Sequence, residues 1–377
     1  MSFLPFAQPT IDEAMVSAIA DVLRSRWIAS GPNVIEFERR LSDYFGGRPT
    51  RVVTSATAAI ELALQIAGVA PGDEVITSAQ SFFTVPNMII RAGARPVFVD
   101  CDLVTRNIDL AQVEHAITPR TKAIIPTHFP GSLVDMDALY TLARRRGVRV
   151  IEDAALVMGS RWNGRPVGSF GDLATFSFHP NKNITTIEGG ALVVNDESEA
   201  KLVEKLRFHG IVRAADGTRD VECAGGKFNL SDVSARLGLA QFARLDEFLA
   251  RRRRLVDHYF AHFRSDPPCV LPPRPARSDD GQSWNMFCVL LPLDRLRITR
   301  AEFIEAMRER GIGIGLSYEA LHLTSLGRTL GHHEGEFPNT ERIARETVTL
   351  PLFPAMEPAD VEHVCDAVRG ILDDAHQ

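Results

Sequence analysis

Short apolar runs alternate with helix-length amphipathic segments from about residue 50 to residue 195. Apolar residues recur at helical spacing in segments such as Ala58–Ala67 and Met136–Arg146, whereas the short runs between such segments are rich in β-branched and aromatic residues. This alternation is typical of an α/β domain with a mostly parallel central sheet. The predicted strands are Arg51–Thr54, Glu74–Thr77, Pro96–Asp100, Lys122–Thr127, Val148–Asp153, Ala174–Phe178 and Ala191–Asn195.

The pattern changes after residue 195. A long helical stretch begins at Ser231 and reaches about Phe263, and a cluster of prolines between residues 267 and 275 follows it. We therefore predict a large domain, residues 1–250, which includes an N-terminal arm, and a small domain, residues 251–377. The small domain is expected to be an α+β module with strands at Trp284–Leu291 and Ile312–Tyr318 and helices at Arg300–Arg310 and Ala359–Asp373.

Composition narrows the function classes. The 377 residues carry a formal net charge of −6, which argues against nucleic acid or an anionic membrane as the main partner because both need clustered positive charge. The five cysteines lie far apart without a CxxC pair, so we expect reduced thiols, no disulfide and no metal site. No apolar run reaches the ~18 residues of a spanning helix and no leader pattern is visible. We expect a cytoplasmic protein that acts on a small molecule.

Lys182 lies in a polar loop between the last two predicted strands of the large domain. His179, Pro180 and Asn181 end the first of these strands, and a Gly-Gly pair at 189–190 opens the second. Burial disfavours the charged form of an amine, so a lysine enclosed there would have a lowered pKa and could condense with an aldehyde. A lysine that pairs with a nearby carboxylate fits the loop equally well, and the loop alone leaves both interpretations open.

Three further features point to a ligand at the carboxyl ends of the predicted strands. Asp153 ends a probable central strand, where its carboxylate could hold a protonated pyridine nitrogen or simply cap the next turn. The helix after the first strand offers free backbone N–H groups and the Thr57 hydroxyl to a phosphate, although a plain helix cap would look much the same. Phe82 could stack on a flat ring, but a single phenylalanine more often fills the core.

Together these features favour one cofactor. No GxxxxGK loop is present and no GxGxxG follows a predicted strand, so nucleoside-triphosphate hydrolysis and nicotinamide chemistry lose their usual support. A lysine that forms an imine, an aspartate for a pyridinium, a helix N-terminus for a phosphate and an aromatic ring are the groups that pyridoxal phosphate (PLP) requires. The residues therefore predict a PLP enzyme.

Several ordered motifs resemble the DegT/StrS family of PLP-dependent nucleotide-sugar aminotransferases over nearly the whole chain. The resemblance rests on Ile-Glu-Asp-Ala-Ala at 151–155, Ser-Phe-His-Pro-Asn-Lys-Asn at 177–183 and Glu-Gly-Gly at 188–190, with further motifs at 27–32, 55–58, 117–126, 228–232 and 350–354. It implies a fold type I transferase that acts as a homodimer with shared active sites. It also implies a ping-pong transfer of an amino group from glutamate to the keto group of a nucleotide-linked sugar or related ketone, in polysaccharide or secondary-metabolite biosynthesis.

The resemblance implies a role for individual residues as well. Lys182 would be the Schiff-base lysine and the proton shuttle, and Asp153 would pair with the pyridine nitrogen. The other implied cofactor contacts are Thr57, Ala58 and Ser177 at the phosphate, Asn229 of the partner subunit beside them, and Phe82 on the ring.

The chain departs from the family pattern where substrate specificity is expected. Leu156 stands where related sugar enzymes typically carry Gln or His, which motivates the hypothesis of a less polar or differently shaped amine acceptor. Candidate substrate residues are also Asn285, Ser317 and Tyr318. The glycine-rich, charged segment 211–227 is expected to be a long loop, and Arg213 and Arg219 within it are candidates for binding the carboxylate of the amino donor.

Two alternative functions compete with amino transfer. A dehydratase of the same family works with the aminated cofactor, but such enzymes resemble this chain with His in place of the lysine. A non-catalytic regulator that kept the fold would usually have lost Lys182 or Asp153, and both are present. The sequence therefore favours the aminotransferase.

Overall fold

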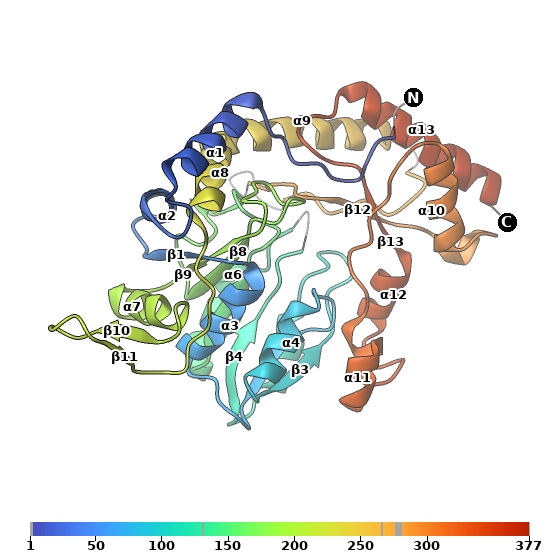
Figure 1. The fold of residues 1–377 in the computed structure, drawn as a ribbon. Helices are drawn as coiled ribbons and strands as arrows, with labels where there is room; N and C mark the ends of the chain where they lie inside the picture. The colour runs from blue at the N-terminus through green and yellow to red at the C-terminus, as the bar shows by residue number, and fades with distance from the viewer. Residues whose placement is uncertain (1–2, 130–131, 265–266, 276–280, 377) are drawn as a thin grey trace.

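The central element of the computed structural model is a seven-stranded sheet, and the structure describes residues 3–129, 132–264, 267–275 and 281–376 (Figure 1). The strands lie in the order β1-β9-β8-β5-β4-β2-β3, with β9 antiparallel to both β1 and β8 and all other neighbours parallel. The mostly parallel sheet and its seven strands are thus confirmed. Their bounds are β1 Thr50–Val53, β2 Glu74–Ser78, β3 Arg95–Val99, β4 Thr121–Ile125, β5 Arg149–Asp153, β8 Leu173–Ser177 and β9 Gly190–Val193.

Helices cover both faces of this sheet, which explains why its strands are nearly continuous apolar runs. One face packs against α3 (Ala56–Ile66), α4 (Thr84–Arg91) and α7 (Glu197–Leu206). The other face packs against two groups of helices. These are α5 (Leu110–Ala116) and α6 (Met136–Arg146) over the parallel half, and α1 (Glu13–Ser25), α2 (Pro32–Tyr44) and α8 (Asp232–Phe242) over β1, β8 and β9.

The predicted helix from Ser231 to Phe263 is two helices in the structure, α8 and α9 (Leu245–His262). Arg244 breaks the helical backbone, with ψ of 10°, and its guanidinium pairs with Asp12 and Glu247. The break lets α8 pack on α1 and α2, while α9 runs on toward the C-terminal part of the chain (Figure 1). Side chains of α9 enter two hydrophobic clusters, one shared with the large sheet and one with α13 (Pro358–Ala375). The predicted boundary after residue 250 falls inside this helix and stays a prediction.

The C-terminal part is built on two antiparallel strands, β12 (Phe287–Leu290) and β13 (Thr347–Leu350), with α10 (Arg300–Glu309) and α13. The prediction of a strand at Ile312–Tyr318 is wrong. This segment forms single bridges to Leu4 of the N-terminal arm and to Thr349, so no ladder develops. The partner of β12 comes instead from a segment that the periodicity did not single out. The remaining helices here are α11 (Ser325–Thr329) and α12 (Pro338–Glu346).

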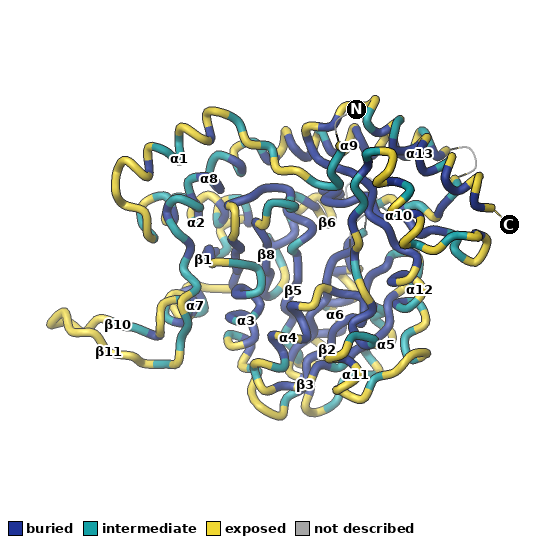
Figure 2. Tube along the Cα trace, turned by 45° about the vertical axis from the view of Figure 1, so that its right-hand side comes forward, coloured by how far each residue is buried: buried dark blue, intermediate teal, exposed yellow. Residues whose placement is uncertain are grey.

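The prediction of a long loop at 211–227 is also wrong in part. Strands β10 (Ile211–Arg213) and β11 (Arg219–Val221) form a hairpin that projects from the body of the molecule and is exposed at its tip (Figures 1 and 2). The turn is closed by a hydrogen bond from the Ala214 N–H to the Thr218 carbonyl, and Gly217 supplies the required positive φ. A second small hairpin joins β6 (Arg161–Trp162) to β7 (Arg165–Pro166).

Within the described residues, no helix is long and apolar enough to cross a membrane. All five cysteines are free thiols.

Candidate active site

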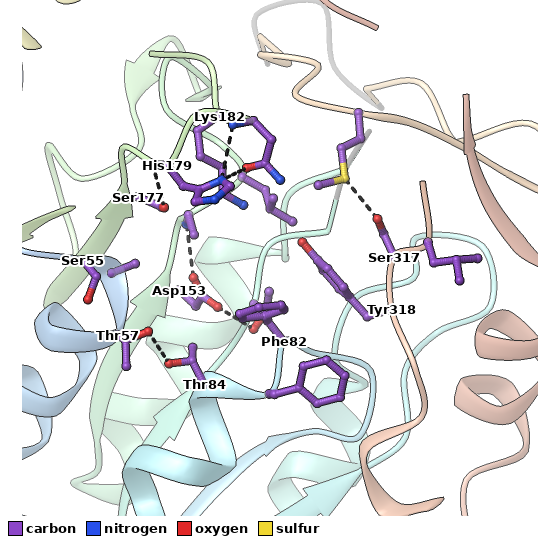
Figure 3. A pocket seen from close by; sticks show the side chains of 18 of the residues that line it. Ser55, Thr57, Phe82, Thr84, Asp153, Ser177, His179, Lys182, Ser317 and Tyr318 are labelled. Carbon is purple, nitrogen blue, oxygen red and sulfur yellow. Dashed lines mark hydrogen bonds between the residues drawn. The ribbon is translucent and has the colours of Figure 1, made fainter. Parts of the chain in front are cut away.

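A cavity of about 390 Å³ opens where the carboxyl ends of the central strands meet (Figure 3). The topology explains its position. Strands β5 and β8 are parallel, and β1 runs in the same direction as β8 because the antiparallel β9 lies between them. The ends of β5 and β8 and the start of α3, which follows β1, therefore lie at one edge of the sheet, where ligands of such folds bind.

Asp153 is the last residue of β5 and is only 3% exposed. Its carboxylate accepts hydrogen bonds from the Thr127 hydroxyl and the Ala155 N–H, each at 3.2 Å. Burial raises the pKa of this carboxyl, whereas the hydrogen bond from Ala155 and the charge of Lys182 oppose the shift. The structure thus places a firmly held carboxylate in the wall of the cavity, where a cationic group of a ligand would stabilise its charge.

Lys182 lies in the loop after β8 and lines the same cavity. Its N–H closes a turn by donating to the His179 carbonyl at 2.9 Å. Part of the side chain reaches the cavity, but the amine is enclosed by protein, and this desolvation lowers its pKa to about 8 although the charge of Asp153 opposes the shift. In the described part of the chain no ion pair involves Lys182. The described residues therefore show no ion-paired lysine here, and the reactive role of the amine stays a prediction.

The start of α3 forms an anion seat. Ser55 caps the helix by accepting the Ala58 N–H at 3.0 Å, which leaves the N–H groups of Ala56 and Thr57 without a bond in the described part of the chain. Ala58, which the resemblance places at the phosphate, therefore has its N–H engaged by Ser55. Thr57 lines the cavity and its hydroxyl accepts from Thr84 at 2.7 Å.

Close packing holds the anion seat in place. A Cβ on Gly190 would lie 2.6 Å from the Ala56 nitrogen, so only glycine lets β9 pass so close to the start of α3. Ser177, at the end of β8, completes this side of the cavity. Both residues come from the strands that flank the Lys182 loop, so the anion seat and the amine are fixed to one another.

Three aromatic residues that line the cavity, Phe82, Phe83 and Tyr318, lie close together. Phe82 is 45% exposed and lines the cavity, so it does not fill the core as a single phenylalanine usually does. Its ring centroid lies 5.5 Å from that of Phe83. The Tyr318 ring, whose centroid is 5.4 Å from that of Phe82, belongs to the same cluster of side chains and is labelled with Phe82 in Figure 3. A flat ligand would find an apolar wall here.

The structure brings most, but not all, of the predicted site residues together. Leu156, Ser317 and Tyr318 line the cavity with the cofactor candidates. Five predicted residues do not line it within one chain. Ala58 is buried in α3, and Arg219 is exposed in β11. Asn285 bonds to the loop that carries Lys182, Asn229 bonds to the Ser30 hydroxyl, and Arg213 is exposed on the projecting hairpin.

Sequence reasoning missed other residues of the cavity wall. Thr127 ends a predicted strand at the same edge of the sheet as Asp153. Because ligands bind at the carboxyl ends of parallel strands, this position could have been predicted. Phe6, Met286 and Leu316 carry no such signal, because tertiary packing alone brings the N-terminal arm and the C-terminal part to this edge. Met286 and Leu316 lie within the two strands that the sequence predicts for the small domain.

These observations fit PLP. The cavity offers a buried carboxylate for a pyridinium, an enclosed amine for an aldehyde, a helix N-terminus for a phosphate and an exposed aromatic ring. The four groups come from different elements, and the fold alone brings them together. They define the class of protein as a PLP-dependent enzyme of fold type I.

Comparison with known proteins gives the family. The sequence profile of the DegT/DnrJ/EryC1/StrS aminotransferase family matches residues 9–369, so the chain belongs to this family and is a PLP-dependent aminotransferase. The spore coat polysaccharide biosynthesis protein SpsC of Bacillus subtilis is 38% identical over 381 aligned residues, which cover 98% of this chain and 97% of SpsC.

Solved structures agree with this assignment. The PLP form of Spr1654 from Streptococcus pneumoniae, provisionally named a sugar aminotransferase, superposes with a TM-score of 0.93 at 30% identity and covers 99% of each chain. The E. coli GDP-4-keto-6-deoxy-D-mannose-3-dehydratase superposes with a TM-score of 0.89 over 97% of this chain and 100% of its own. At 23% identity, that second likeness shows the fold alone.

Proposed function

We propose that this aminotransferase moves an amino group from glutamate to the keto group of a nucleotide-linked sugar or a related ketone, in two half-reactions of a ping-pong cycle. One observation carries the proposal: the enclosed Lys182 amine and the buried Asp153 carboxylate line one cavity beside a helix N-terminus. The likeness to SpsC and to Spr1654 supports a sugar as the acceptor. We further propose that it works in the cytoplasm as a homodimer.

Some residues of the cavity would hold the cofactor, and Lys182 would also transfer a proton. Bound PLP supplies an electron sink for the exchange of an amine and a ketone. Asp153 would hold the pyridine nitrogen, and Phe82 would cover one face of the ring. Lys182 would bind the aldehyde carbon and, once displaced by substrate, take up and return a proton at its Nζ, for which a pKa of about 8 is suitable near neutral pH.

The phosphate would lie at the start of α3. The Thr57 hydroxyl and main-chain N–H and the Ser177 hydroxyl are the donors that line this part of the cavity. Asn229 of the partner subunit would complete the seat in the homodimer. In a single chain its side chain bonds to Ser30 and Lys227 and does not line the cavity.

The apolar side chains that would face the acceptor favour a substrate that is apolar on the side that contacts them. Leu156 is 3% exposed and Met286 is 5% exposed, and both line the cavity. The Ser317 hydroxyl is already engaged, because it accepts from Thr349 at 3.0 Å and donates to the Met286 sulfur at 3.4 Å. Unpaired buried hydroxyls are costly, so an acceptor that presents few hydroxyls to this wall is favoured.

The proposal is tested by incubating the PLP-loaded protein with glutamate and a panel of nucleotide-linked keto sugars and simpler ketones. We expect glutamate alone to release about one equivalent of 2-oxoglutarate per site, and continuous release once a competent ketone is added. Borohydride reduction followed by peptide mass spectrometry should place the cofactor on Lys182. Attachment at another lysine would remove the proposed role of Lys182, and a sugar product that has lost a hydroxyl without gaining an amino group would favour the dehydratase.

A further inference from the structure

Asn285 lies behind the Lys182 loop rather than in the cavity. It comes from the segment just before β12 and is 4% exposed. Its side-chain nitrogen Nδ2 donates to the Asn181 carbonyl at 3.0 Å and to Asn183 Oδ1 at 3.3 Å. One amide group therefore holds the residue before Lys182 and the residue after it.

The orientation of this amide is fixed by its neighbours. The Asn181 carbonyl can only accept, so the NH₂ side of Asn285 must face it. Asn183 is fixed in turn, because its Nδ2 donates to the Met158 carbonyl at 2.9 Å and only its Oδ1 remains to face Asn285. The Asn285 Oδ1 is buried without a partner among the described residues. An unpaired acceptor in a buried amide destabilises the fold. The two bonds donated by Nδ2 are therefore the interactions that favour an asparagine at this position.

A buried arginine supports Asn285 from the other side. Arg252, on α9, is 2% exposed and donates to the carbonyls of Asn285 at 3.1 Å and Leu352 at 2.8 Å. Burial lowers its pKa to about 10, and no carboxylate pairs with it in the described part of the chain. Arg252 therefore donates to main-chain carbonyls, and one of these is the carbonyl of Asn285.

We propose that Asn285 is a positioning residue, which keeps the Lys182 amine enclosed in the cavity by holding both of its chain neighbours. The inference rests on the proposed role of Lys182. Without the two bonds, the turn at residues 181–183 can move outward and admit water to the amine. Water would stabilise the charged form, so the pKa of Lys182 would rise from about 8 toward the ordinary value of a lysine near ~10.4.

The test compares Asn285→Ala with a matched control, Asn339→Ala. Asn339 also donates through Nδ2 to a main-chain carbonyl, that of Cys101 at 2.9 Å, but it does not line the cavity. The full-length protein is freed of cofactor and labelled briefly with acetic anhydride from pH 6 to 11, and mass spectrometry follows Lys182. Its rate follows the fraction of neutral amine, so a rise of one pKa unit slows labelling well below the pKa about tenfold.

We expect a fall of about tenfold or more at pH 7 in Asn285→Ala, faster release of PLP from the loaded enzyme, and neither change in Asn339→Ala. A variant of similar size that removes both donated bonds without adding a charge, Asn285→Leu, should show the same change. An unchanged labelling curve in a folded Asn285 variant overturns the positioning role. Loss of folding in both variants also overturns it and assigns Asn285 to stability alone. A wild-type pKa near ~10.4 would instead count against the proposed role of Lys182 itself.

Discussion

The Lys182 amine and the Asp153 carboxylate line one cavity, and each shifts the pKa of the other. Burial lowers the pKa of Lys182 to about 8 and raises that of Asp153, while the opposite charge acts against both shifts. The two groups of opposite charge therefore stabilise one another in the cavity without a direct hydrogen bond between them. Changing one of them should be measurable at the other.

Asp153→Asn removes the charge that keeps the pKa of Lys182 from falling further. We expect the pKa of Lys182 to drop below 8 in the cofactor-free protein, so that acetic anhydride labels it faster at pH 7. Turnover should fall by about 10²-fold or more, because an amide cannot carry the charge that pairs with a protonated ring nitrogen. Asp109→Asn, which changes the cap of α5 away from the cavity, serves as the control. A rise in the pKa of Lys182 would contradict the prediction.

Lys182→Met should stabilise the cofactor-free protein at neutral pH. A lysine with a folded pKa of about 8 and an unfolded pKa near ~10.4 binds more protons when unfolded. Lys182 therefore lowers the free energy of unfolding by its full amount below pH 8. The stability of the wild type rises with pH between these two pKa values. We expect Lys182→Met to gain on the order of 1–3 kcal/mol at pH 7, and the gain to shrink toward zero above about pH 10.5. Urea unfolding at both pH values is the measurement, and an equal gain at both would exclude the electrostatic cause.

Gly190→Ala should displace the start of α3. The added Cβ would meet Ser55 C at 2.5 Å and Ala56 N at 2.6 Å, both main-chain atoms that cannot rotate away. We expect a loss of about 1–3 kcal/mol in the free energy of unfolding and weaker binding of PLP. The control is Gly370→Ala on α13, where a Cβ meets no atom within 4 Å, and which should gain ~0.5–1 kcal/mol. Similar losses in both variants would refute the packing argument.

Leu156→Gln should change the preference among acceptors. The glutamine brings an amide into an apolar wall, where it would favour ketones that carry a hydroxyl at this position. We expect the ratio of kcat/KM for a hydroxylated over a deoxygenated acceptor to rise at least about tenfold. Met286→Leu, an apolar exchange in the same wall, should leave the ratio unchanged. An unaltered substrate profile in Leu156→Gln would count against this wall as the acceptor site.

The amino-acid sequence is sufficient to predict the large sheet and the chemistry at its edge. Seven strands were predicted within two residues of their observed bounds, because buried parallel strands are continuous apolar runs with turn residues at their ends. The same rule placed Asp153 at a strand end and Lys182 in the next loop of the edge. These are local properties of the chain, and the motifs that carry the family resemblance lie in the same segments.

The surroundings of these residues depend on tertiary packing. The strand partner of β12, the break at Arg244 and the arm that brings Phe6 to the cavity all depend on contacts between segments far apart in the chain. Asn285 shows the reason most clearly. Its residue type is compatible with substrate binding, but its place behind the Lys182 loop follows from the packing of β12 and α9 against the large sheet, which no local pattern records.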